Sequence, residues 1–218
     1  MLNASVLRLS LAVCLTLVAV GAALAAEKPL VSSGTEVSTP GGRRPPPAVT
    51  AFVLKQLSAD DRSDLKDCLA EKRLGRSDYA ALLTAIPVKA GGDRTLWFVR
   101  PALEPYCHSL YGAHIYRYFL VEQKIGVSRL RLLYADGGDE FSIYRRQSHG
   151  LNDIEASGCI VDGCRTARMA WNGRRYRPTL CTRNFFTGDG KEIVKRRRCG
   201  SDDWSDAQAS GLNPKDHP

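Results

Sequence analysis

The sequence predicts an α+β domain in which N-terminal helices pack on a mainly antiparallel β-meander held by disulfide bonds. Three observations lead to this prediction: apolar residues recur at helical spacing over 49–69, apolar and polar residues alternate in short segments over 82–179, and cysteines are spread through the same region. We expect one domain over 49–200, between a flexible Pro, Gly and Ser-rich leader at 26–48 and a disordered polar tail at 201–218.

The first 25 residues are typical of a secretory signal peptide. Arg8 precedes the apolar stretch Leu11–Val20, and the segment ends in Ala23-Leu24-Ala25, so cleavage is expected before Ala26. An uncleaved membrane anchor is the alternative, because the apolar stretch approaches the length of a spanning helix. After cleavage no membrane span is expected, and the chain is predicted to be periplasmic or secreted.

Two helices are expected at the start of the domain. The first follows Pro45–Pro47 and has apolar positions at Val49, Phe52, Val53 and Leu57. Ser58 is expected to cap the second, which ends at Gly75 and turns Leu65, Cys68 and Leu69 toward the core.

Seven strands are expected after the helices, on the basis of alternating patterns and of Gly-rich turns such as KAGGD and ADGGDE. Their expected bounds are Leu82–Val88, Thr95–Arg100, His114–Val121, Ser128–Tyr134, Phe141–Arg145, Thr166–Trp171 and Arg174–Thr179.

Asn172-Gly173 predicts a tight two-residue hairpin turn. The opposed pairs would then be Trp171 with Arg174, Ala170 with Arg175, Met169 with Tyr176, and Arg168 with Arg177. Ala167, Met169, Trp171 and Tyr176 would face the core, and Arg168, Arg175 and Arg177 would share the other face. Opposed arginines repel, so this face is either compensated by solvent and neighbouring carboxylates or binds an anionic partner.

Six cysteines remain after the signal peptide, which contains Cys14. In an oxidising compartment such a set indicates disulfides. We expect Cys68 with Cys107, Cys159 with Cys164, and Cys181 with Cys199, because each pair closes a contiguous loop without crossing another. The alternative, a zinc site, lacks a C-x-x-C motif and a histidine near Cys159 and Cys164.

The formal net charge of +8 favours an acidic partner. A basic cluster near the C-terminus comprises Lys195, Arg196, Arg197 and Arg198. It suits an anionic envelope polymer or a solvated loop end, and no aromatic interrupts it, so specific nucleic-acid recognition is not expected.

Catalytic motifs are absent: the sequence has no G-x-S-x-G, no H-E-x-x-H and no phosphate-binding loop. His108 and His114 are the remaining candidates, as a general acid and base acting on a phosphodiester. Structural or surface histidines are the alternative. Neither a metal nor a cofactor is expected.

Two short stretches carry a resemblance. HGLNDIEASG at 149–158 with AWNGRRYR at 170–177 resembles a unit common in uncharacterised secreted and periplasmic proteins of proteobacteria. AIPVKAGGDRTLWFVRP at 85–101 is similar to a degenerate FG-GAP-type hairpin. The resemblance implies β-hairpins and export. It does not extend to calcium, because Pro87–Gly92 contains no carboxylate.

Three functions are therefore considered. The first is a non-enzymatic envelope protein that binds an anionic partner through the basic hairpin face. The second is a periplasmic inhibitor or immunity protein of a cell-wall hydrolase, for which the positive charge is unfavourable because many such hydrolases are cationic. The third is a small hydrolase that uses His108 and His114.

Overall fold

The computed structural model describes residues 27–107, 110–111, 116–160, 163–187, 189 and 191–199. The expected signal peptide, the expected disordered tail, His108 and His114 lie outside these residues. The described elements are β1 (Val31–Gly34), α2 (Pro47–Gln56), α3 (Ala59–Glu71), the 3-10 helix η2 (Arg76–Leu82), β2 (Leu83–Lys89), β3 (Arg94–Pro101), β4 (Tyr116–Lys124), β5 (Leu130–Gly138), β6 (Glu140–Ser148), β7 (Leu151–Ile160), β8 (Gly163–Trp171), β9 (Tyr176–Phe186) and β10 (Glu192–Arg197).

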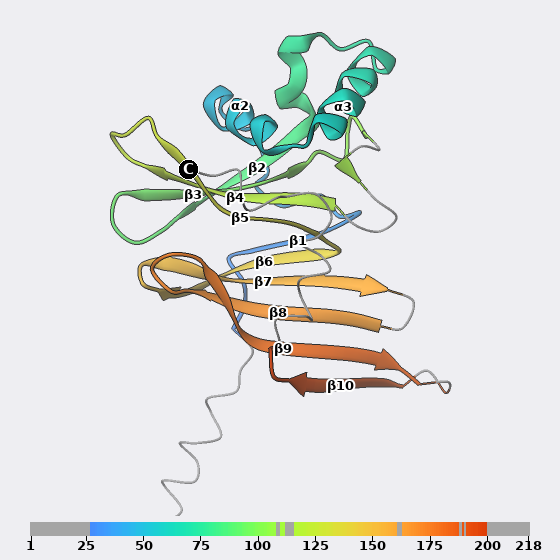
Figure 1. Ribbon diagram of the computed structural model, residues 1–218, viewed down its shortest axis with the longest axis vertical. Coiled ribbons are helices and arrows are strands. Elements are labelled where there is room, and N and C mark those ends of the chain that lie inside the picture. Colours follow the sequence, from blue (N-terminus) through green and yellow to red (C-terminus); the bar gives the residue numbers. More distant parts are fainter. Residues whose placement is uncertain are drawn as a thin grey trace, which may run out of the picture.

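The two α-helices follow the local signals in the sequence. Pro47 occupies the start of α2, where its missing N–H leaves no hydrogen bond unmade. Ser58 caps α3: its side chain accepts from the Asp61 N–H, and the Asp61 carboxylate accepts from the Ser58 N–H. The helix ends at Glu71, before the expected Gly75. Figure 1 shows both helices beside the four-stranded sheet.

The strands form two antiparallel sheets. The four-stranded sheet has the order β2-β3-β4-β5, and the six-stranded sheet has the order β1-β6-β7-β8-β9-β10 (Figure 1). The chain passes from one sheet to the other at Asp139, between β5 and β6. ADGGDE is therefore a crossover, and it is not the tight turn that its glycines suggest.

Gly138 makes this crossover possible. A Cβ atom there would lie 2.5 Å from the Ser157 carbonyl oxygen, closer than a real side chain allows. The adjacent Asp139 N–H donates to the same carbonyl over 2.8 Å. The end of β5 is thereby held against β7 of the other sheet.

Aromatic side chains fill the space between the sheets. The Phe98 ring stacks on the Phe141 ring with centroids 4.9 Å apart, and the Tyr118 ring lies 4.7 Å from Phe141. Tyr134 of β5 meets Tyr176 of β9 edge-on at 6.2 Å. These contacts bury large apolar areas and join the two sheets into one core.

The coarse prediction of fold class is confirmed: helices accompany antiparallel strands, and three disulfides are present. The finer prediction was incomplete, since the protein is richer in strands and has two sheets in place of one meander. Strands β1, β7 and β10 were not predicted.

The prediction of a flexible leader is wrong for the residues around β1. Val31 is 7% exposed, and β1 pairs with β6 from Val31 opposite Ile143 to Gly34 opposite Glu140. The physical reason is Arg100 of β3, which is only 1% exposed. A buried guanidinium needs acceptors for its N–H groups, and the segment supplies them.

Several groups of this segment accept hydrogen bonds from Arg100. The Ser33 hydroxyl accepts over 2.6 Å and the Thr35 carbonyl over 2.8 Å, and the Gly34 carbonyl also accepts. The Arg100 guanidinium lies 4.1 Å over the Tyr116 ring. The segment and this arginine therefore hold each other in place.

Candidate functional site

The β8–β9 hairpin differs from the predicted register. Trp171 lies opposite Tyr176, and Ala170 lies opposite Arg177. The Asn172 carboxamide oxygen accepts from the N–H groups of Arg174 and Arg175, and this side-chain bonding stabilises a four-residue loop. The prediction of a two-residue turn was therefore wrong.

The predicted core face of this hairpin is nevertheless confirmed. A register shift of two residues leaves every side chain on the same side of a sheet, whereas a shift of one would reverse it. The four predicted core residues are all buried: Ala167, Met169, Trp171 and Tyr176.

The hairpin arginines (Arg168, Arg175 and Arg177) do not form the predicted repelling pair. A β-bulge follows Arg168, which therefore lies opposite Leu180. The Arg168 guanidinium is 2.6 Å from the Glu27 carboxylate and lies 4.0 Å over the Tyr144 ring. Arg168 is thus occupied by contacts within the chain, while Arg175 and Arg177 are exposed.

Glu27 is held as an anion by these contacts. The Arg146 backbone N–H donates to one of its oxygens, and Arg168 donates to the other. Chiefly through the Arg146 hydrogen bond, and also through Arg168, the pKa of Glu27 is lowered from its usual value. The compensation that the sequence required for Arg168 therefore comes from a residue before β1.

The catalytic candidates, His108 and His114, lie outside the described residues, so their arrangement stays untested. His149 is exposed in the turn between β6 and β7, with φ 49°. Asp153 accepts from the Ser148 hydroxyl over 2.7 Å and pairs with Arg146 at 3.2 Å. Within the described ranges, no three His, Cys, Asp or Glu side chains converge as a metal site would require.

In the same part of the chain, no helix is long and apolar enough to cross a membrane.

The cysteines form the three predicted disulfides. Cys68 of α3 bonds to Cys107, Cys159 of β7 to Cys164 of β8, and Cys181 of β9 to Cys199, just after β10. Three disulfides are consistent with a secreted or extracellular protein.

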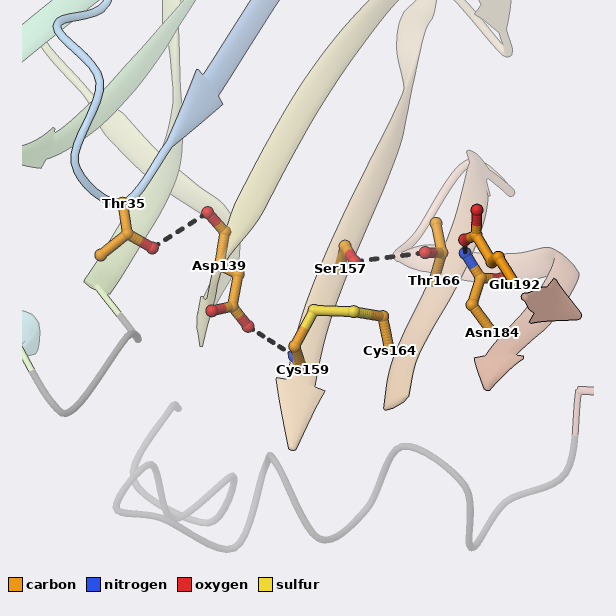
Figure 2. Close-up of a disulfide and its surroundings, with 8 residues drawn as sticks. All are labelled: Thr35, Asp139, Ser157, Cys159, Cys164, Thr166, Asn184 and Glu192. Atoms are coloured by element: carbon orange, nitrogen blue, oxygen red, sulfur yellow. Dashed lines mark hydrogen bonds between the residues drawn. A yellow bond between two sulfur atoms is a disulfide. The ribbon is translucent and has the colours of Figure 1, made fainter. Parts of the chain in front are cut away.

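The Cys159–Cys164 disulfide fixes the end of the β7–β8 hairpin, because its two cysteines lie directly opposite each other. Figure 2 shows Asp139 accepting from the Cys159 N–H, and the Thr166 hydroxyl donating to Ser157 on the neighbouring strand. Arg165 follows Cys164 directly, so its position on β8 is fixed by the same bridge.

The side chains of the basic cluster at 195–198 do not share one side of the sheet. Lys195 and Arg197 lie on one side of β10, whereas Arg196 lies on the other and Arg198 follows the strand. The interpretation as a solvated loop end was therefore wrong for residues 195–197, which pair with β9.

A row of cations crosses three neighbouring strands. Arg165 of β8 lies opposite Arg183 of β9, which lies opposite Lys195 of β10. We call these three residues the cationic row. Arg197 lies two residues further along β10, on the same side of the sheet.

The cationic row lies on the side of the sheet that faces the core elsewhere. Ala156 of β7 and Ala167 of β8, on this side, are 1% and 0% exposed. Towards β10 the same side comes into solvent: Arg165 and Arg183 are half-buried, and Lys195 is exposed. Figure 1 shows the reason, because β9 and β10 lie at the end of the sheet farthest from the four-stranded sheet.

The aromatic ring of Phe185 lies beside the cationic row. The Arg183 guanidinium lies 4.5 Å from its ring centroid, and the Lys195 ammonium lies 5.6 Å from it. Within the described residues, neither cation has a carboxylate at ion-pair distance. Opposed like charges destabilise a sheet, and a bound anion would relieve that repulsion.

Sequence reasoning missed this row because Arg165 and Arg183 are separated in the chain by a hairpin of unexpected register. One signal could have located Arg165: a Cys159–Cys164 bridge between opposed residues places Arg165 opposite Gly158. Arg183 could not be placed, because a four-residue loop and a bulge precede it.

Comparison with known protein families, curated proteins and solved structures gives no match for this chain. The resemblance to FG-GAP-type hairpins and to secreted proteobacterial proteins therefore stays a prediction.

Proposed function

We propose that this chain is an exported, non-enzymatic protein of the bacterial envelope, periplasmic or secreted, that binds an anionic polymer through the cationic row. The ligand is a chain with repeated phosphate or carboxylate groups. The observation that carries the proposal is the alignment of Arg165, Arg183 and Lys195 across three strands on an accessible side of the sheet.

The spacing of the row suits a ligand with several charges. Neighbouring strands lie about 4.8 Å apart, so the row offers a series of cations along a line across the sheet. Each anionic group bound there would relieve repulsion between neighbouring cations and gain a charge-assisted hydrogen bond. A polymer gains more than a single ion, because its later groups bind without a further loss of translational freedom.

Export is supported by the amino-terminal pattern of the sequence and by the three disulfides. In the envelope, the available anionic polymers carry phosphate or carboxylate groups. The formal net charge, +8 for the full sequence, stays positive after loss of Arg8 with the expected signal peptide and favours encounter with such polymers.

The test compares two double variants of the mature chain that lose the same charge. Arg183→Gln with Lys195→Gln removes two cations from the row, whereas Arg175→Gln with Arg177→Gln removes two exposed arginines elsewhere on β9 and its loop. Calorimetric titration with long-chain polyphosphate and with polygalacturonate separates phosphate from carboxylate ligands.

We expect the row variant to lose about tenfold in affinity for the preferred polymer, and the control to lose at most about twofold. Binding should weaken as salt is raised. Equal losses in the two variants would show that only net charge matters. That result, or no binding of either polymer by the unaltered chain, would overturn the proposal.

A further inference from the structure

β10 is the edge strand of the six-stranded sheet, and it is accessible on both sides. Every residue from Glu192 to Arg197 is exposed, including two apolar side chains: Ile193 at 41% and Val194 at 57%. An edge strand presents unpaired backbone N–H and C=O groups that can pair with another strand.

The hairpin bonds show which backbone groups of β10 point away from β9. The Thr187 N–H donates to the Lys191 carbonyl over 2.9 Å, so these opposed residues form a hydrogen-bonded pair. The register between β9 and β10 then runs without a bulge, and such pairs alternate with pairs that do not exchange hydrogen bonds. Ile193, Lys195 and Arg197 therefore bond to β9.

It follows that Glu192, Val194 and Arg196 direct their backbone groups away from β9, toward the free edge. These three residues also share one side of the sheet. Any strand added at this edge would bond to these three residues.

We infer that β10 pairs antiparallel with β10 of a second copy of this chain, with Val194 opposite Val194 of the second copy. This pairing joins the two six-stranded sheets edge to edge about a two-fold axis perpendicular to the sheet. The inference does not depend on the proposed polymer binding, because its register is selected by the backbone edge and by Glu192, Val194 and Arg196, which lie on the opposite side of the sheet from the cationic row.

Charge complementarity selects this register. When the axis passes through Val194, Glu192 lies opposite Arg196 of the second copy, and symmetry repeats the pair. An axis through Glu192 would place two glutamates opposite each other, and an axis through Arg196 would place two arginines opposite each other. Opposite charges across strands stabilise the pair and like charges destabilise it.

The remaining opposed positions are compatible with this register. Ile193 lies opposite Lys195 of the second copy, whose aliphatic stem can cover it. Lys191 lies opposite Arg197 of the second copy, but Lys191 is already paired with Asp189 at 2.9 Å. Lysines and arginines on an edge strand usually prevent pairing, whereas here Glu192 makes the edge self-complementary.

Disulfide trapping tests the register in the full mature chain. The Cα atoms of opposed hydrogen-bonded residues lie about 5.5 Å apart, within the range of about 4.4 to 6.8 Å that a disulfide spans. Val194→Cys should form a covalent dimer under mild oxidation. Ile193→Cys, on the same exposed strand, should not form one alone but should crosslink when mixed with Lys195→Cys. Equal crosslinking of Val194→Cys and Ile193→Cys alone would overturn the inference.

Charge reversal tests the complementarity by sedimentation velocity over a range of protein concentrations, without any polymer. Glu192→Arg and Arg196→Glu should each raise the dimer dissociation constant by about tenfold or more, and the double variant should restore it. A chain that is monomeric at every concentration would overturn the inference. Failure here leaves polymer binding by the monomer intact, so the two proposals fail separately.

Discussion

Two regions of the molecule differ in the partners that their cations have. Where residues 27–37 pass, Arg100 of β3 is 1% exposed and donates to groups of residues 33–37, and Arg168 of β8 pairs with Glu27. At the β10 end, Arg183 and Lys195 contact the Phe185 ring and have no carboxylate partner among the described residues. The segment before α2 supplies the partners of Arg100 and Arg168. The comparison shows that the cations which this segment reaches are engaged within the chain, whereas Arg183 and Lys195 contact an aromatic ring.

Substitution of Arg100 is expected to cause the largest loss of stability. Arg100→Leu leaves several buried carbonyl and hydroxyl groups without a donor, and each such group costs about 1 to 3 kcal/mol. We expect the free energy of unfolding to fall by at least about 3 kcal/mol, as measured by urea denaturation. Hydrogen exchange should rise first in β1.

Arg43→Leu is the matched control for this change. Arg43 lies 5.6 Å over the Trp97 ring on an exposed part of the same leader, so its loss should cost below about 1 kcal/mol. If the two variants were equally stable, Arg100 would not be what holds the segment.

The next effect concerns Tyr116, whose hydroxyl donates to the Ser33 carbonyl. Burial raises the pKa of Tyr116 to about 12. Between the ordinary value of 10.0 and this value, the unfolded chain releases the phenolic proton while the folded chain retains it, so stability falls as pH rises.

Tyr116→Phe should make this alkaline loss of stability shallower by about 1.4 kcal/mol per pH unit, although it also costs one hydrogen bond at neutral pH. Urea denaturation at several pH values measures the slope. An unchanged slope between pH 10 and pH 12 would show that this phenol ionises freely in the folded protein.

Substitution of Glu27 is expected to have the smallest effect on stability. Because its pKa is lowered in the folded state, its contribution is present above the unfolded value near 4.5 and is lost as pH falls through the folded value. Glu27→Gln should cost less than about 1 kcal/mol at neutral pH and should reduce the acid dependence of stability.

Glu27→Gln also sharpens the comparison of the two regions. It frees Arg168, which lies on the opposite side of the sheet from the cationic row. We therefore expect polyphosphate affinity to change by no more than about twofold, although the net charge rises by one. A tenfold gain would mean that the hairpin arginines, and not the row, bind the polymer.

Local sequence patterns predicted the structure correctly where the pattern was regular. The capping box at Ser58, the alternation in β2 to β5 and the pairing of successive cysteines each pointed to the observed element or pair. β7 was missed because the buried polar residues Asn152 and Asp153 interrupt its alternation. β1 and β10 were missed because one lies in a Pro and Gly-rich stretch and the other is mostly charged.

The sequence by itself determined the helices, most strands, the cysteine pairs and the core face of the β8–β9 hairpin, because these depend on neighbours along the chain or on a period of two. Only the tertiary structure decided that the leader joins a sheet, that Arg168 is neutralised and that Arg165, Arg183 and Lys195 align. Register across a hairpin depends on loop length and bulges, and the partners of a cation depend on which distant segment passes over it. Neither is encoded in the local pattern of apolar and polar residues.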